Sequence, residues 1–318
     1  MSVPDVIITD VGPRDGLQNQ SRILTPDQRI ALIEQLIQAG VRQIEAGAMV
    51  SPKAVPAMAG SDEVIASLAK RHRTDPQARG QSKARVQLQA LIPNLKGYQL
   101  AVKAGADSVL FVVCASETMN QKNVRLSVQQ SVQQLQQILQ QAKADNIQLL
   151  TCIAVAWQCP FEGKTPPSQV LSLASSLAEI GAEQLVLADT IGAANPASVR
   201  QLMQALVQAH DASKLGCHFH DTRAMGLANV AAALDVGIRR FDASIGGLGG
   251  CPFAPGATGN VATEDVVMML EQMGLATGID LAALCQAGQL AGELTGQCSG
   301  GRANSWRQLQ LAAKQPLC

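Results

Sequence analysis

The most constraining feature of this sequence is a repeated change in the spacing of its apolar residues. Short apolar runs, typical of buried strands, alternate with segments in which apolar residues recur every three or four positions, as on a surface helix. Strands are expected at 6–10, 42–46, 86–92, 108–113, 147–155, 185–188, 215–219 and 240–243, and helices at 26–39, 63–69, 95–104, 127–146, 167–180, 196–209, 226–235 and 261–273. Eight strand–helix units in one chain of this length predict an α/β fold, the (β/α)8 TIM barrel. A doubly wound open sheet is the alternative, because strand number is hard to count from sequence.

No linker-like stretch divides the chain, so the barrel is expected to occupy residues 1–275 as one domain. A further helical pattern at 281–294 precedes a tail rich in Gly and Ser. Residues 276–318 are therefore predicted to form a C-terminal helical extension packed on the barrel. The glutamine-rich stretch 127–146 is interpreted as a surface helix, because Val128, Val132 and Leu135 lie at helical spacing.

The charge balance argues against two classes of partner. Lys plus Arg and Asp plus Glu number 25 each, so no net field favours nucleic acid or a membrane surface. No apolar run approaches the length of a membrane-spanning helix, and residues 1–16 resemble neither a signal nor a transit peptide. The eight cysteines form no CxxC pair, so we expect reduced thiols in a cytoplasmic protein.

Polar side chains gather just after the expected strands, which is where barrel enzymes place their chemistry. These residues are Arg14, Asp15, Glu45, Glu117, Asp189, Thr190, His218, His220, Cys251 and Asn260. Any single one of them has a structural alternative, since an Asp after a strand often caps the next helix. Their agreement at six strand ends favours a common site.

Two histidines, His218 and His220, lie two residues apart on one expected strand and so face the same side. Cys217 alternates with them and points away. A glycine-rich loop, 246–260, follows and contains Cys251. Imidazole nitrogens together with carboxylate or amide oxygens suit a divalent ion that keeps positions open for substrate. A hydrogen-bonded histidine pair in the core is the alternative.

Several motifs resemble those of the 3-hydroxy-3-methylglutaryl-CoA lyase family. They are TDVGPRDGLQNQ (9–20), IEAGAMVSPKAVPAMAGSDEV (44–64), IPNLKGYQLAVKAG (92–105), CPFEGK (159–164), LADTIG (187–192) and GLGGCPFAPGATGNVATED (247–265). The resemblance runs from about Val6 to Thr295, and the long Gly/Cys loop is its most specific part. It implies a (β/α)8 barrel, in agreement with the hydrophobic pattern.

By position, the resemblance implies a Mg²⁺ or Mn²⁺ site with the ligands Asp15, His218, His220 and Asn260. It also implies catalytic roles for Arg14, Asp15, His218 and Cys251, with Glu45 behind the arginine and Asp189 as a further polar group of the site.

The implied reaction is cleavage of a tertiary 3-hydroxyacyl-CoA to acetyl-CoA and a 3-oxoacid, as in leucine degradation and ketone-body formation. Arg14 would stabilise the thioester oxygen, and Asp15 or His218 would take the hydroxyl proton. Cys251 would protonate the enolate carbon. The expected partners are an acyl-CoA substrate and a second copy of the chain in a homodimer.

Two stretches depart from the family pattern, namely Arg223 and residues 46–49 (AGAM). They leave open a substrate with a larger or more polar 3-substituent, for which Arg223 would offer a carboxylate contact. A Claisen-type acetyl-CoA synthase is a second alternative, against which the Cys251 loop and the lack of room for a regulatory domain argue. A non-catalytic acyl-CoA-binding barrel is a third, although no expected ligand is missing.

Overall fold

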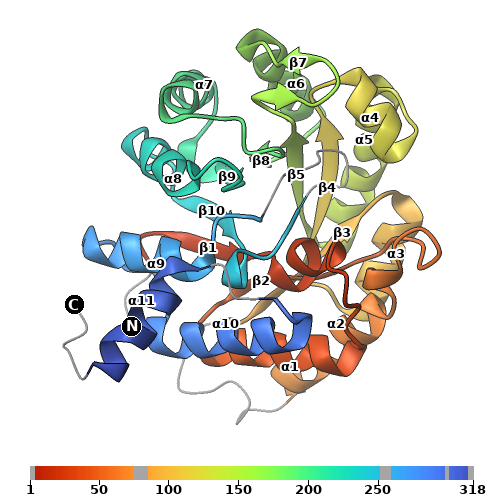
Figure 1. Cartoon of the computed structure of the whole chain (residues 1–318). Helices are drawn as coiled ribbons and strands as arrows, with labels where there is room; N and C mark the ends of the chain where they lie inside the picture. The colour runs from red at the N-terminus through yellow and green to blue at the C-terminus, as the bar shows by residue number, and fades with distance from the viewer. Residues whose placement is uncertain (1–3, 75–84, 251–258, 298–300, 314–318) are drawn as a thin grey trace.

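The computed structural model describes residues 4–74, 85–250, 259–297 and 301–313. Within them, parallel strands close into a barrel (Figure 1). Around the barrel they are β1 (Ile7–Asp10), β10 (Arg240–Ala243), β9 (Leu215–Phe219), β8 (Gln184–Asp189), β5 (Gln148–Ala154), β4 (Ser108–Cys114), β3 (Gln87–Ile92) and β2 (Gln43–Ala48). The (β/α)8 prediction is confirmed. The doubly wound alternative is wrong, because the first strand pairs with the last, with Ile7 opposite Arg240.

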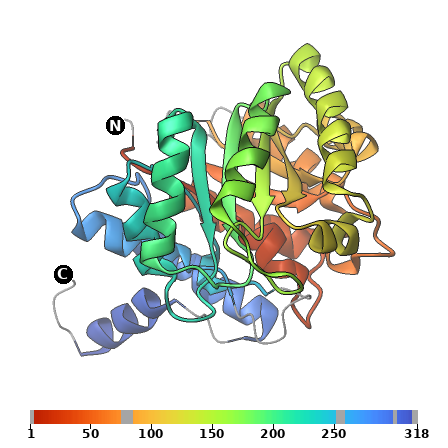
Figure 2. The same cartoon turned by 90° about the horizontal axis from the view of Figure 1, so that it is seen from above.

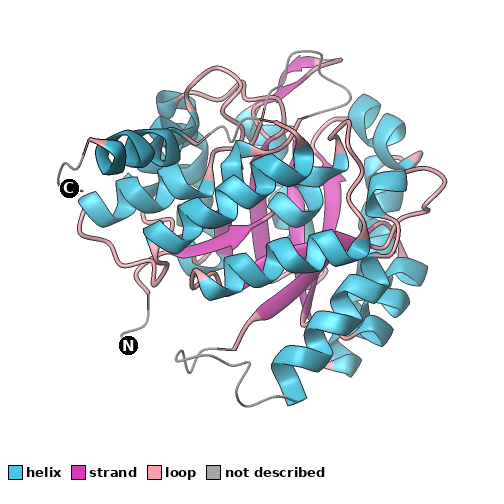
Figure 3. Cartoon of the chain, turned by 60° about the horizontal axis from the view of Figure 1, so that its bottom comes forward, coloured by secondary structure: helices cyan, strands magenta, loops and turns pink. Residues whose placement is uncertain are grey.

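Helices follow the barrel strands and cover the outside of the barrel (Figure 3). They are α1 (Pro26–Gln38), α2 (Ser61–Thr74), α3 (Leu95–Ala104), α5 (Val128–Asp145), α6 (Pro167–Glu179), α7 (Pro196–Ala209), α8 (Gly226–Asp235) and α9 (Thr263–Gln272). Three of them begin with a capping box, in which Thr25, Ser127 or Asn195 exchanges hydrogen bonds with the residue three positions later.

The inside of the barrel is layered along its axis. At the amino ends of the strands, polar side chains line a small cavity: Thr9, Gln43, Gln87, Gln89, Ser108, Gln148 and Gln184. Above them lies an interior cluster, made of Leu110, Cys152, Val186 and Ala188 together with Val112 and Leu150. The candidate site lies above this cluster, at the carboxyl ends of the strands.

Some elements were not expected from the sequence. The helix α4 (Glu117–Val124) precedes α5, and a short hairpin, β6 (Gln158–Cys159) with β7 (Gly163–Lys164), precedes α6. The expected Gly/Ser-rich tail contains a helix, α11 (Arg302–Ala312). Short helical turns are η1 (Gly12–Gly16), η2 (Pro56–Met58), η3 (Ala212–Lys214) and η4 (Ile245–Gly247).

The C-terminal helices lie beside the first and last units of the barrel. The helix α10 (Leu281–Thr295) contacts α1, α9 and η4, and α11 contacts α9. Figure 1 shows α10 alongside α1, and in Figure 2 α11 lies at the edge of the molecule. The backbone N–H of Asp280 donates to the carbonyl of Ala39 at 2.7 Å, so the segment before α10 is held against the end of α1. No helix in the described part of the chain combines the length and the apolar content needed to cross a bilayer.

Candidate active site and metal centre

The turn after β1 presents two functional side chains in succession. The carbonyl of Val11 accepts the N–H groups of Arg14, Asp15 and Gly16 at 3.1, 2.7 and 3.2 Å, which folds residues 12–16 into one turn of π-helix. Such turns are rare and are often found at functional sites. Here the turn places Arg14 and Asp15 at the carboxyl end of the barrel.

Arg14 is held by two carboxylates. Its Nε and Nη2 donate to the two oxygens of Glu45 at 2.6 and 3.1 Å, and its Nη1 donates to Asp15 at 2.8 Å. Burial lowers the pKa of Arg14, but the charges of Glu45 and Asp15 outweigh it and raise the pKa overall. The guanidinium is therefore a fixed positive charge in a rigid orientation.

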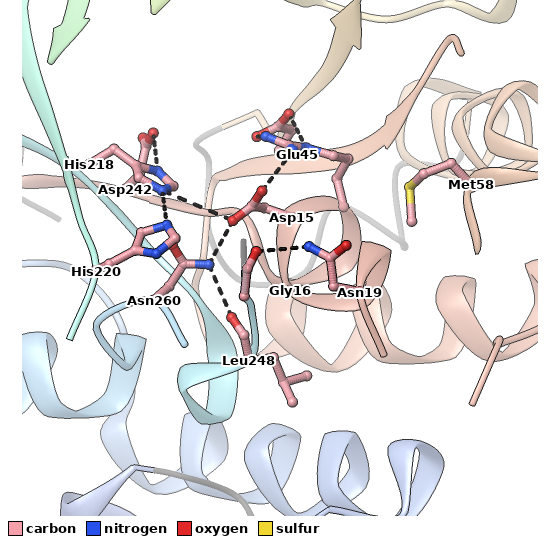
Figure 4. Close-up of polar contacts among 12 residues, drawn as sticks. Asp15, Gly16, Asn19, Glu45, Met58, His218, His220, Asp242, Leu248 and Asn260 are labelled. Atoms are coloured by element: carbon pink, nitrogen blue, oxygen red, sulfur yellow. Dashed lines mark hydrogen bonds and ion pairs between the residues drawn. The ribbon is translucent and has the colours of Figure 1, made fainter. Parts of the chain in front are cut away.

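His218 and His220 converge as the sequence predicts. Both extend from the end of β9, their ring centroids lie 5.2 Å apart, and their Nε2 atoms lie 3.2 Å apart (Figure 4). Burial, and then the neighbouring His218, lower the pKa of His220 to about 4, so His220 is neutral near pH 7. A neutral imidazole has a lone pair free for a metal ion.

Asp242 orients His218 from the neighbouring strand. It lies opposite His218 in the β10–β9 register, and its carboxylate is 3.2 Å from His218 Nδ1. This contact places the proton on Nδ1 and leaves Nε2 directed at the site, the arrangement that orients metal-bound histidines in many proteins. Burial lowers the pKa of His218, but Asp242 and Asp15 raise it overall.

Asn260 follows β10, the last strand of the barrel, and contacts the turn that follows β1. Its Nδ2 donates to Asp15 Oδ2 at 2.8 Å and to the carbonyl of Leu248 at 3.0 Å. Its Oδ1 is buried and has no hydrogen-bond partner within the described residues. A buried amide oxygen of this kind calls for a partner, such as a water or an ion.

These residues fit a divalent metal ion. One ligand atom each from Asp15, His218 and His220 lie within 4.8 Å of one another, next to the unpartnered oxygen of Asn260. Burial raises the pKa of Asp15, but Arg14 and the two histidines lower it to about 2, so the carboxylate is charged. A charged oxygen and two imidazole nitrogens form the mixed donor set of a site that keeps positions open for substrate.

The cluster forms one wall of a cavity of about 270 Å³. Arg14, Asp15, His218, His220 and Asp242 lie on that wall. The rest of the lining is mostly apolar, and the charged and imidazole groups of the lining are all in the cluster. The cavity therefore has a charged end and an apolar end.

Residues 5–291 match the family model described as HMGL-like. The chain belongs to the HMGL-like family. It is 40% identical to the hydroxymethylglutaryl-CoA lyase of Pseudomonas mevalonii over 309 residues, which cover 97% of each chain. It is 38% identical to a 3-hydroxy-3-isohexenylglutaryl-CoA/hydroxy-methylglutaryl-CoA lyase of Pseudomonas aeruginosa, over 95% of this chain and 97% of the relative. The structure of an HMG-CoA lyase from Acinetobacter baumannii in complex with coenzyme A and 3-methylmalate matches with a TM-score of 0.86 and 37% identity, over the whole of both chains. The resemblance inferred from the motifs is confirmed.

Other expected residues of this HMGL-like chain lie away from the cluster. Asp189 is buried and accepts the N–H groups of Ala193 and Ala194 at 2.7 and 3.0 Å; burial raises its pKa to about 6. Glu117 accepts the N–H of Val128 and so links α4 to α5. Neither carboxylate is among the described residues that line the cavity.

The two stretches that depart from the family pattern also lie outside the cavity lining. Arg223 is exposed, and Ala46 and Ala48 are buried in the core. Neither they nor Gly47 and Met49 are among the lining residues that the structure describes. Cys251 lies outside the described residues.

The sequence reading missed two features of the site. Asp242 had only a weak local signal, a carboxylate one position before the end of a strand, and its role depends on the register with β9. The small side chains of Cys152 and Ala188 at the base of the cavity were also missed, because short strands do not show which face points inward.

Proposed function

We propose that this chain is a divalent-metal-dependent carbon–carbon lyase that cleaves 3-hydroxy-3-methylglutaryl-CoA, or a close 3-hydroxyacyl-CoA, to acetyl-CoA and acetoacetate or a related 3-oxoacid. The observation that carries the proposal is the convergence of Asp15, His218 and His220 within 4.8 Å, beside a buried arginine and inside a mostly apolar cavity. The family membership and the printed activities of the relatives support the same reaction.

Asp15, His218, His220 and Asn260 would hold Mg²⁺ or Mn²⁺. When bound, such an ion acidifies and orients the 3-hydroxyl of the substrate. Arg14, fixed by Glu45, is placed to stabilise the thioester oxygen as the C2–C3 bond breaks and charge moves onto the acetyl-CoA enolate.

Two proton transfers complete the reaction. The hydroxyl proton passes to Asp15 or His218, both of which belong to the cluster, as the carbon–oxygen bond becomes a carbonyl. The enolate carbon then takes a proton from the thiol of Cys251. The resemblance and the position of this cysteine, which follows Gly250 in the cavity lining, support that role.

We extend the proposal to the partners and the setting of the enzyme. The substrate is an acyl-CoA, the chain works as a homodimer, and its products connect it to leucine degradation and ketone-body formation in the cytoplasm. The cysteines that the structure describes are buried thiols, which suits a reducing compartment: Cys114, Cys152, Cys159, Cys217 and Cys285.

The test is release of acetyl-CoA from 3-hydroxy-3-methylglutaryl-CoA by the purified chain with added Mg²⁺ or Mn²⁺. His218→Gln and Cys251→Ala should abolish turnover while the circular dichroism spectrum is kept. His210→Gln and Cys285→Ala are matched controls, because neither residue is among the cavity lining. Retained cleavage by both His218→Gln and Cys251→Ala would contradict the mechanism.

A different 3-hydroxyacyl-CoA is the second candidate substrate. The Pseudomonas aeruginosa relative is described as acting on a 3-isohexenyl as well as the 3-methyl compound. Parallel assays with both thioesters decide between them by the ratio of kcat/KM.

A further inference from the structure

Where β5 and β8 form the base of the cavity, its lining side chains are unusually small. Barrel interiors are generally filled by bulky branched residues. Here the lining residues from β5 and β8 are Cys152, Ala154 and Ala188. The neighbouring strand β4 contributes the larger Leu110, Phe111 and Val112 as well as Cys114. Cys152 and Ala188 belong to the interior cluster, so the cavity reaches down into the barrel above Leu110 and Val186.

This base lies directly beside the reacting end of the cavity. Cys152 lines the same cavity as Arg14 and Asp242. The charges of Asp242, Arg14 and Glu45 also act on its thiol. Burial, the largest effect, raises the pKa of the Cys152 thiol well above its usual value, so the group is uncharged. The surface it presents to a ligand is small and neutral.

The chemistry of the lining selects the kind of group that fits there. Away from the cluster, the polar lining residues are the neutral Gln18, Asn19, Asn123 and Thr190. No cation outside the cluster is available, among the described lining residues, to pair with a second carboxylate. A hydrocarbon chain can be buried in this neutral part of the cavity without a desolvation cost. A charged group there would lose its hydration without gaining a partner of opposite charge.

The size of the cavity allows more than a methyl group. A dry cavity of about 150 Å³ is large enough for benzene, a group of six carbons. The cavity has about 270 Å³, which leaves room for a chain of several carbons beside the reacting carbons at the cluster.

We propose that the small side chains of Cys152 and Ala188 form a pocket for the substituent on C3, and that this pocket admits alkyl chains longer than methyl. The inference rests on the proposed lyase function and names its substrate class as 3-alkyl-3-hydroxyglutaryl-CoA thioesters. Cleavage of the C2–C3 bond then gives acetyl-CoA and the 3-oxoacid that carries the longer chain.

The experiment uses the full chain with Mn²⁺ and a series of thioesters whose 3-substituent is methyl, propyl or pentyl. In the unmodified enzyme, kcat/KM for the pentyl compound should be at least equal to that for the methyl compound. Cys152→Leu should lower the pentyl-to-methyl ratio at least about 10-fold, because one misplaced methylene in an apolar pocket changes specificity by this order. Ala188→Val narrows the same pocket from β8 and should act in the same direction if Cys152→Leu does not fold.

Cys152→Ala is the matched control, since it widens the pocket and should keep or raise the ratio. The inference is overturned if the unmodified enzyme cleaves only the methyl compound, or if both narrowing variants leave the ratio unchanged. Absence of acetyl-CoA from every thioester would instead contradict the lyase function. In that case the thermal shift caused by each thioester still tests the pocket, and a shift that falls as the chain lengthens overturns it.

Discussion

His218 and His220 are the same side chain two residues apart, yet their neighbours shift their pKa values in opposite directions. Both are buried, which lowers the pKa of each. Asp242 and Asp15 more than offset this for His218, whereas for His220 the neighbouring His218 lowers the pKa further. The protonation and orientation of each ring therefore depend on residues around the histidines as much as on the histidines themselves.

Removing the charge of Asp242 tests this dependence. Asp242→Asn should lower the affinity for Mn²⁺ about 10–100-fold, the usual effect of losing the partner that orients a histidine ligand. Titration of Mn²⁺ followed by electron paramagnetic resonance measures the affinity. Asp235→Asn, at an exposed residue paired with Arg200 on the surface, is the control. An unchanged affinity in Asp242→Asn would show that Asp242 does not orient His218.

Much of the site could be predicted from the types of its residues and from their positions just after strands. Arg14, Asp15, Glu45, His218 and His220 do come together. Asp242 could not be predicted in its role, because it meets His218 only through strand register, across a separation of 24 positions in the chain.

The elements next to the site depend on close approach of backbone to backbone. Gly259 lies so close to Gly247 that a Cβ on Gly259 would be 2.3 Å from the carbonyl oxygen of Gly247, and Gly259 has φ +56°. A side chain there would have to move the backbone that carries Asn260.

Gly259→Ala is therefore expected to weaken metal binding and activity at least about 10-fold by displacing Asn260, which is itself a candidate ligand and donates to the candidate ligand Asp15. Gly274→Ala is the matched control: it also has a positive φ, +78°, but no atom within 4 Å of the added Cβ. The control should lose about 1 kcal/mol of stability and keep its metal affinity. Equal metal affinities in the two variants would contradict the role given to Gly259.

The first turn of α5 allows a separate prediction about stability. Ser127 accepts the N–H of Gln130 and completes the capping box of α5. Ser127→Ala should lower the free energy of unfolding by about 1 kcal/mol. Urea denaturation measures this, with Ser168→Ala as the control, because α6 has no side-chain cap and Ser168 is exposed. Equal losses in both variants would rule out capping as the cause.

The elements that could be predicted are the long ones with a strong apolar period, such as α5 and α7. The missed helices bury few side chains. In α4 these are Met119 and Asn120, and in α11 they are Ala303 and Asn304. Their positions are set by tertiary contacts that leave no periodic signal in the sequence.

For the whole molecule, two buried acids lie where the barrel closes. Asp10 accepts a hydrogen bond from Thr263 at 2.7 Å, and Glu264 accepts the N–H of Gly246 at 3.0 Å. Burial raises the pKa of Asp10 to about 6 and that of Glu264 to about 8. Glu264 therefore carries a proton in the folded protein at neutral pH, but its usual pKa of 4.5 means that the unfolded chain has lost it.

Since the folded state binds the extra proton, stability falls as pH rises from about 4.5 to 8. Glu264→Gln keeps the shape of the neutral acid and removes this dependence. The variant should therefore gain stability relative to the unmodified protein between pH 5 and pH 8, on the order of 3–4 kcal/mol. Urea denaturation at both pH values measures the gain. The same difference at both pH values would mean that Glu264 does not titrate in this range.

The hydrogen bond from Asn260 to Asp15 joins residues 245 positions apart in the chain. A growing polypeptide leaves the ribosome from its N-terminus at roughly 5–20 residues per second, so Asp15 emerges on the order of 10–50 s before Asn260. Until then no nascent chain contains the complete set of oxygen and nitrogen donors. Ion capture by the full set thus comes only late in synthesis, when the ring of strands has its last member.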